Sequence, residues 1–261
     1  MSSNSVLKTN NLSVGYRTKS EVIRIAKNID LNIAEGELVG LIGVNGVGKS
    51  TLLRSLSGVQ PALEGEIQIM EKSLKEISPE LLAQTISVVL TEQPISKNLS
   101  VSELIALGRQ PYTNWIGTLS RNDKDKIQSA LELVNIESLK HKRCFELSDG
   151  QLQKVLIGRA LAQDTPLIIL DEPTTHLDMY HQAYVLKLLK RLTTETNKSI
   201  LFATHEINLA LQLCDKMIVM DKKNVHIGTP NELIEQQVFS NIFPSDLIYF
   251  DKDSLSFKIK T

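Results

Sequence analysis

The sequence has few cysteines, almost no net charge and no long apolar run, and each absence argues against a class of protein. Its two cysteines, Cys144 and Cys214, lie far apart and away from any histidine at ligand spacing, which disfavours a zinc site or a disulfide framework. Lysine and arginine number 29 against 30 aspartate and glutamate, so no overall field attracts nucleic acid. Residues 1–9 lack the apolar core of a secretory signal, and no apolar stretch reaches about 18 residues. We therefore expect a cytosolic chain that neither crosses a membrane nor binds nucleic acid.

Strand and helix patterns alternate along the chain and predict an α/β fold. Residues 5–14 and 22–33 show broken period-two patterning, which is typical of an antiparallel layer with one solvent-exposed face. Short apolar runs predict further strands at 37–42, 65–70, 85–90, 167–170, 199–203 and 216–220. Helical spacing of apolar residues predicts helices at 52–56, 79–84, 179–195 and 206–213. This order is typical of a mostly parallel sheet.

Residues 101–163 differ from the rest of the chain because their apolar residues recur at helical spacing, over 101–107, 124–134 and 152–161. We interpret 1–261 as a single domain, with a core over about 1–95 and 160–230 and a helical subdomain over about 96–160. The tail, residues 231–261, has weaker patterns and no predicted role.

Residues 43–50 read Gly-Val-Asn-Gly-Val-Gly-Lys-Ser and match the P-loop pattern G-x-x-x-x-G-K-[ST], between a predicted buried strand and a helix. Gly43, Gly46 and Gly48 let the backbone curl so that several N–H groups, with Asn45 in the same loop, surround one anion. The positive end of the following helix points at the same place. An ordinary glycine-rich turn is the alternative, but it has no need of the Lys-Ser pair.

The last two residues of this motif, and Thr51 after them, predict a triphosphate with Mg²⁺ as the ligand. Lys49 would place a positive charge between the outer phosphates and so assist catalysis. Ser50 would offer its hydroxyl to Mg²⁺, and Thr51 would donate to an inner phosphate.

Two carboxylates follow the apolar run at 167–170, at the edge of a parallel sheet where ligands bind. Asp171 would hold Mg²⁺, and Glu172 would accept a proton from the attacking water. The alternative is that both merely cap the loop before Pro173. The P-loop upstream favours the nucleotide role.

A third motif, Leu-Ser-Asp-Gly-Gln at 147–151, opens a helix with Ser148 as its predicted N-cap. We refer to these five residues as the signature segment. In this order and spacing the motifs resemble the ABC transporter ATP-binding family, over about residues 7–228. The family's signature is usually Leu-Ser-Gly-Gly-Gln, so Asp149 departs from it and places a carboxylate near a polyanion. The resemblance implies a P-loop NTPase core (RecA-like, with a mostly parallel sheet), an antiparallel β layer and a helical insertion.

The resemblance assigns roles to three further residues. Tyr16 would stack on adenine, although a tyrosine on a half-buried strand is the alternative. His205 would contact the γ-phosphate, although a lone histidine there is more often structural. Asp178 would belong to the loop that links two nucleotide sites across a dimer, and it is also a predicted N-cap.

The family also places a glutamine after the strand that we predict at 85–90, as a ligand of Mg²⁺ and of the attacking water. Gln93 is our choice, and Thr91 or Glu92 could occupy that place in register.

By the same resemblance, two copies pair head to tail. Ser148, Gly150 and Gln151 of one copy would contact the γ-phosphate bound by the other, and hydrolysis with Glu172 as base and His205 in line would let the copies part.

Residues 107–109 (Leu-Gly-Arg) and 111–112 (Pro-Tyr) resemble the ATPases of importers for iron-siderophores, haem or cobalamin. This resemblance implies integral-membrane permease subunits, indirectly a solute-binding protein, and a peripheral location at the cytoplasmic face of the inner (plasma) membrane. The alternatives are a subunit of an exporter, a non-transport ABC ATPase, and a module that binds nucleotide without hydrolysing it. Intact Lys49, Asp171, Glu172 and His205 argue against the last.

Overall fold

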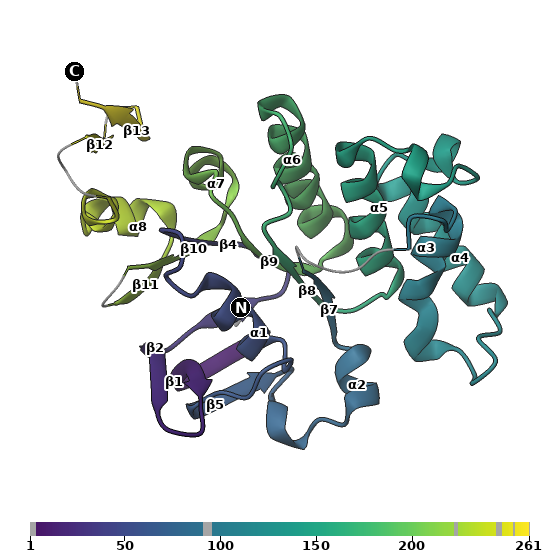
Figure 1. The fold of residues 1–261 in the computed structure, drawn as a ribbon, viewed down its shortest axis with the longest axis horizontal. Coiled ribbons are helices and arrows are strands. Elements are labelled where there is room, and N and C mark those ends of the chain that lie inside the picture. Colours follow the sequence, from purple (N-terminus) through teal and green to yellow (C-terminus); the bar gives the residue numbers. More distant parts are fainter. Residues whose placement is uncertain (1–3, 91–95, 222–223, 244–246, 253, 261) are drawn as a thin grey trace.

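The computed structural model describes residues 4–90, 96–221, 224–243, 247–252 and 254–260. Its central element is a sheet of six strands in the order β11-β10-β4-β9-β8-β7 (Figure 1). The five strands from β10 to β7 are parallel, and β11 pairs antiparallel at the edge. In chain order these strands are β4 (Leu38–Gly43), β7 (Ile86–Val89), β8 (Leu167–Asp171), β9 (Ser199–Ala203), β10 (Lys216–Met220) and β11 (Val225–Gly228).

A second, antiparallel sheet has the order β2-β1-β5-β6, with β3 beside β1. Its strands are β1 (Ser5–Arg17), β2 (Val22–Ile29), β3 (Asn32–Ala34), β5 (Glu64–Ile69) and β6 (Lys72–Ser73). The strand that we predicted over 22–33 is divided in two, because the register of β1 shifts near Asn11, which has a left-handed backbone (φ 47°) that asparagine tolerates. Thus β2 pairs with the second half of β1 and β3 with the first.

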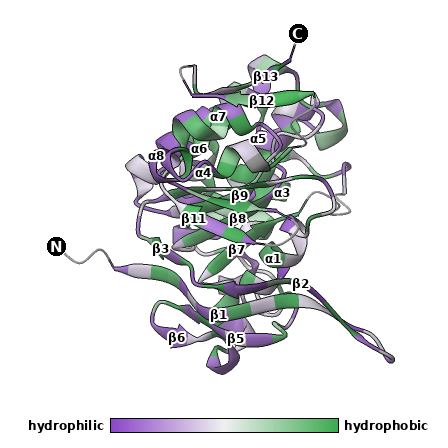
Figure 2. Ribbon diagram, turned by 90° about the vertical axis from the view of Figure 1, so that its left-hand side faces the viewer, coloured by the Kyte–Doolittle hydropathy of each residue, from purple (hydrophilic) through white to green (hydrophobic). Residues whose placement is uncertain are grey.

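The parallel sheet is buried on both faces, as its uninterrupted apolar strands predicted. Leu38 and Ile42 of β4 point into one hydrophobic core, and Val39 and Leu41 point into the other. One core contains the helices α6 (Met179–Thr196) and α7 (Ile207–Leu213), and the other contains α1 (Lys49–Leu56) and the antiparallel sheet. Figure 2 shows these layers edge on, with α6 and α7 on one side of the parallel sheet and α1 and the antiparallel sheet on the other.

The predicted helical block contains α3 (Val101–Ala106), α4 (Arg121–Leu133) and α5 (Asp149–Ala162), which pack on one another beside β7 (Figure 1). The first of them continues as a 3₁₀ helix over Leu107–Tyr112. A short helix, α2 (Pro79–Ala83), precedes β7 where the sequence predicted one. None of the described helices combines the length and the apolar composition needed to span a membrane.

The tail, whose role the sequence did not predict, contains α8 (Pro230–Glu235), β12 (Ile248–Asp251) and β13 (Ser256–Ile259). Phe250 stacks on Phe239 and meets Phe257 edge on, with ring centroids about 5 Å apart in both pairs. The backbone N–H of Phe257 donates to the side chain of Asn208 in α7. Phe239 and Phe250 also belong to the hydrophobic core that contains α6 and α7, so the aromatic cluster joins the tail to that core.

Candidate functional site

The loop between β4 and α1 holds its shape through glycines. Gly46 and Gly48 have φ values of 74° and 110°, a region in which side chains are strained. A Cβ atom on Gly48 would lie 2.1 Å from Cγ2 of Ile25 in β2. Only glycine therefore lets the loop pass so close to the antiparallel sheet before it enters α1 at Lys49.

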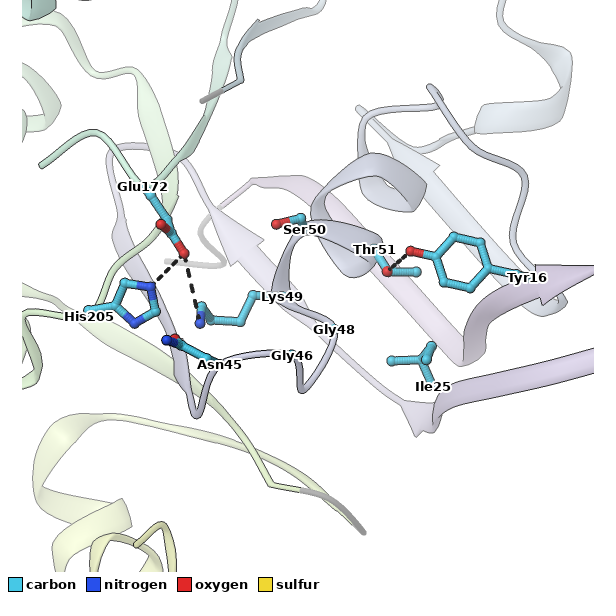
Figure 3. A pocket seen from close by; sticks show the side chains of 10 residues that line it. All are labelled: Tyr16, Ile25, Asn45, Gly46, Gly48, Lys49, Ser50, Thr51, Glu172 and His205. Carbon is cyan, nitrogen blue, oxygen red and sulfur yellow. Dashed lines mark hydrogen bonds and ion pairs between the residues drawn. The ribbon is translucent and has the colours of Figure 1, made fainter. Parts of the chain in front are cut away.

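An open cavity of about 460 Å³ lies over this loop and the N-terminus of α1 (Figure 3). Residues that follow β8 and β9 of the parallel sheet, and residues of β1 and β2 of the antiparallel sheet, complete its walls. The cavity brings together nearly all residues that we predicted for one nucleotide: Tyr16, Asn45, Gly46, Gly48, Lys49, Ser50, Thr51, Glu172 and His205. Gly43 lies beneath them, and its carbonyl accepts from Lys49.

Lys49 carries its ammonium group in the base of the cavity. Its side chain is only 5% exposed, its Nζ donates to the Gly43 carbonyl at 3.1 Å, and it lies 3.9 Å from Oε1 of Glu172. Burial lowers the pKa of Lys49, while the nearby carboxylates of Glu172 and Asp171 oppose that change. The cation is thus held among backbone and carboxylate oxygens in a place where a phosphate could bind.

Glu172 is fixed by contacts on both oxygens of its carboxylate. Oε1 lies 2.7 Å from Nε2 of His205, and Oε2 accepts from the Thr175 hydroxyl at 3.2 Å (Figure 3 shows the first contact). The residue itself has a left-handed backbone with φ 51°, and its N–H donates to the Ala203 carbonyl in β9. Such strain is characteristic of functional sites, and here it directs the carboxylate into the cavity.

Asp171, the last residue of β8, lies behind the cavity next to Ser50. It is 8% exposed, and burial raises its pKa, whereas a hydrogen bond with the Ser50 hydroxyl opposes the rise. A carboxylate and a hydroxyl are the oxygen ligands that Mg²⁺ prefers, and a cation would offset the cost of burying this charge. Among the described residues, no group of three or more His, Cys, Asp or Glu side chains could hold a metal alone.

Tyr16 and Ile25 form the end of the cavity farthest from Glu172 (Figure 3). The Tyr16 ring is 41% exposed, and its hydroxyl lies 2.5 Å from that of Thr51, so a hydrogen bond holds the ring at the start of α1. The sequence analysis missed Ile25, because it belongs to no motif and only the contact between β2 and the loop brings it into the site.

The predicted residues of the signature segment and Asp178 lie outside this cavity. Ser148 and Gln151 form a capping box at the start of α5, and Asp178 caps α6 by accepting from the His181 N–H at 2.8 Å. The predicted N-cap positions are thus observed. Asp149 is the first residue of α5 and lines a second cavity, of about 280 Å³, that also borders Glu172. Gln93, like its alternatives Thr91 and Glu92, falls outside the described residues.

The sequence profile of the ABC transporter family matches residues 26–175, which contain the loop, the signature segment and both carboxylates. This chain belongs to the ABC transporter ATP-binding family. The family and the fold that the motifs predicted, together with the class of ATPase, are thereby confirmed.

Relatives of known class agree with the assignment of this chain to the ABC transporter ATP-binding family. The petrobactin import ATP-binding protein of Bacillus anthracis is 36% identical over 225 residues, which cover 86% of this chain and 83% of that protein. The iron(3+)-hydroxamate import ATP-binding protein of Bacillus subtilis is 33% identical over 241 residues, 92% of this chain and 88% of that protein.

Two solved structures extend the likeness to three dimensions. The first is a chain of a metal-chelate type ABC transporter in an inward-facing conformation, with a TM-score of 0.80 at 27% identity. The match covers 98% of the present chain and 96% of the transporter chain. A dimeric ATP-binding cassette in a post-hydrolysis state with ADP and phosphate has a TM-score of 0.73 at 28% identity, over 86% and 98% of the two chains.

Thr175 is a second residue that the sequence did not indicate, and its hydrogen bond to Glu172 predicts an effect on turnover. In the ABC ATPase, Thr175→Val keeps the shape of the side chain but removes the hydroxyl, which frees the carboxylate to rotate. We expect kcat to fall roughly five- to tenfold with ATP affinity unchanged, because one hydrogen bond contributes about 1 kcal/mol. Thr175→Ser keeps the hydroxyl and should retain activity. An equal loss in both variants, measured by steady-state hydrolysis, would attribute the effect to packing instead.

Proposed function

We propose that this ABC ATPase binds and hydrolyses ATP at the cytoplasmic face of the inner (plasma) membrane to energise the import of a metal chelate of the ferric siderophore kind. The observation that carries the proposal is the placement of Lys49, Glu172 and His205 around one cavity over the P-loop. The import names of the two relatives and the metal-chelate type of the structural neighbour support the class of cargo.

The groups that line the cavity around Glu172 could carry out each step of ATP hydrolysis. The γ-phosphate would lie over the N-terminus of α1, where backbone N–H groups and the Lys49 ammonium neutralise the charge that develops during transfer. Glu172 would accept the proton of the attacking water as its oxygen bonds to phosphorus and the bond to the ADP oxygen breaks. His205, 2.7 Å from Glu172, would hold that water and the γ-phosphate in line.

Ser50 and Asp171 would hold Mg²⁺, with Gln93 as a third predicted ligand. When bound, the ion would neutralise charge on the outer phosphates. The closeness of Ser50 to Asp171 supports this pair of ligands, since the Ser50 hydroxyl opposes the rise in the pKa of Asp171 that burial causes.

A second copy of the chain would cover the nucleotide. The cavity is open to solvent, and water weakens every charge contact made inside it. Ser148, Gly150, Gln151 and Asp178 lie outside it at the starts of two helices, where Ser148 and Asp178 are exposed and would meet the nucleotide of another copy. The dimeric cassette with ADP and phosphate supports this arrangement.

Integral-membrane permease subunits would convert the opening and closing of this dimer into transport, and a solute-binding protein would deliver the cargo. The test is uptake of a radiolabelled ferric hydroxamate by cells that lack the chain. We expect uptake to fall to background and to return with the wild-type gene but not with a Glu172→Gln copy. If the deletion strain took up the ferric hydroxamate normally but failed to export another compound, the chain would instead be a subunit of an exporter.

A further inference from the structure

His181, in the first turn of α6, contacts both of the segments that the proposed dimer would present to a second copy. Its Nδ1 lies 2.9 Å from Oδ1 and 2.9 Å from Oδ2 of Asp178. Its ring also lies over the start of α5, because a Cβ atom on Gly150 would come within 2.9 Å of Cδ2 of His181. One side chain thus joins the loop before α6 to the signature segment.

The contact with Asp178 fixes the orientation of the ring. Since Nδ1 must carry a proton to donate to a carboxylate, the ring cannot turn without losing that hydrogen bond. The pKa of Asp178 is lowered, first by the backbone N–H of His181 and then by its ring, so this carboxylate stays ionised. The ring is held in one orientation although the side chain is 46% exposed.

A second contact continues the same face of the two helices. Lys154 follows Gly150 by one turn of α5, and Tyr184 follows His181 by one turn of α6. The Lys154 ammonium lies 4.0 Å from the centroid of the Tyr184 ring, a cation–π contact. Since α5 belongs to the helical block and α6 to the core, His181 and Tyr184 connect these two parts of the chain beside the signature segment.

We propose that His181 is a positioning residue that holds the signature segment and the Asp178 loop at a fixed spacing, so that both reach the nucleotide of a second copy together. The inference rests on the proposed function, because it needs a dimer that hydrolyses ATP. It also gives a reason for glycine at position 150. Any side chain there would displace the imidazole from the carboxylate that orients it.

The test compares His181→Ala, His181→Asn and a matched control, His141→Ala, which removes an exposed histidine of the helical block. We expect His181→Ala to lower kcat roughly ten- to one-hundredfold, because small displacements of groups that contact the reacting phosphate are costly. ATP affinity and Tm should stay at wild-type values, since His181 does not line the cavity over the P-loop. The amide of His181→Asn can replace Nδ1 as donor to Asp178 and should recover part of the loss. His141→Ala should behave as wild type.

A size exchange tests the contact with the signature segment directly. Gly150→Ala alone should lower kcat, and adding His181→Ala should not lower it further, because the methyl group then occupies the space of the ring. Unchanged kcat in His181→Ala, or parallel losses of Tm and ATP affinity, would overturn the proposal. A wild-type chain that hydrolyses no ATP would instead refute the proposed function, so the two failures are distinguishable.

Discussion

Replacing Glu172 by glutamine is expected to lower the rate of ATP hydrolysis about 1,000-fold while ATP stays bound. The amide keeps the size of the carboxylate but cannot accept the proton of the attacking water. It also removes one of the two carboxylates that oppose the lowering of the Lys49 pKa. The Lys49 ammonium remains beside Asp171, so the P-loop should still bind the triphosphate. Steady-state hydrolysis and ATP binding by calorimetry measure the two effects separately.

The proposed dimer adds a second expectation for the same variant. Because the γ-phosphate that both copies would contact is not removed, Glu172→Gln should remain dimeric with ATP, whereas the wild type should return to monomers as ADP forms. Size-exclusion chromatography with ATP distinguishes these states. Glu21→Gln, an exposed glutamate in the turn between β1 and β2, is the matched control. Hydrolysis at the wild-type rate in Glu172→Gln would remove this residue as the base.

The parts of the site that the sequence predicted are those whose residues are neighbours along the chain. The P-loop over 43–50 and the pair Asp171 and Glu172 each follow a buried strand directly, and the parallel sheet then brings both strand ends to one edge. Pattern and topology therefore suffice to place Lys49 near Glu172. The same reasoning predicted the caps at Ser148 and Asp178, because an N-cap depends on local sequence alone.

Residues whose contribution depends on tertiary contacts could not be predicted. Ile25 reaches the cavity through the packing of β2 on the P-loop. Thr175 donates to the Glu172 carboxylate within a turn in which Glu172 has a left-handed backbone. His181 contacts Gly150 across two helices that are far apart in sequence. The edge strand β11 was also missed, because it has only four residues and so short a strand gives little pattern along the sequence.

Replacing Lys49 by methionine should impair ATP turnover in two ways, because it acts on binding and on the chemical step together. Methionine matches the length of the lysine stem and fills the same space, so the loss can be assigned to the ammonium group rather than to a void. Without that charge the γ-phosphate would face the Glu172 carboxylate with less positive charge beside it. We expect kcat to fall about 100- to 1,000-fold, the typical effect of removing one donor that stabilises developing charge, with ATP affinity also weakened.

The matched control for Lys49→Met is Lys187→Met, which neutralises an exposed lysine of α6. It should bind and hydrolyse ATP as the wild type does, because its side chain does not line the cavity over the P-loop and its charge is screened by solvent. Calorimetry with Mg·ATP and steady-state hydrolysis compare both variants. If Lys49→Met kept wild-type turnover, neutralisation of the terminal phosphate would have to come from the backbone N–H groups of α1 and from bound Mg²⁺. The buried ammonium would then serve only to offset the charges of Glu172 and Asp171 in the folded chain.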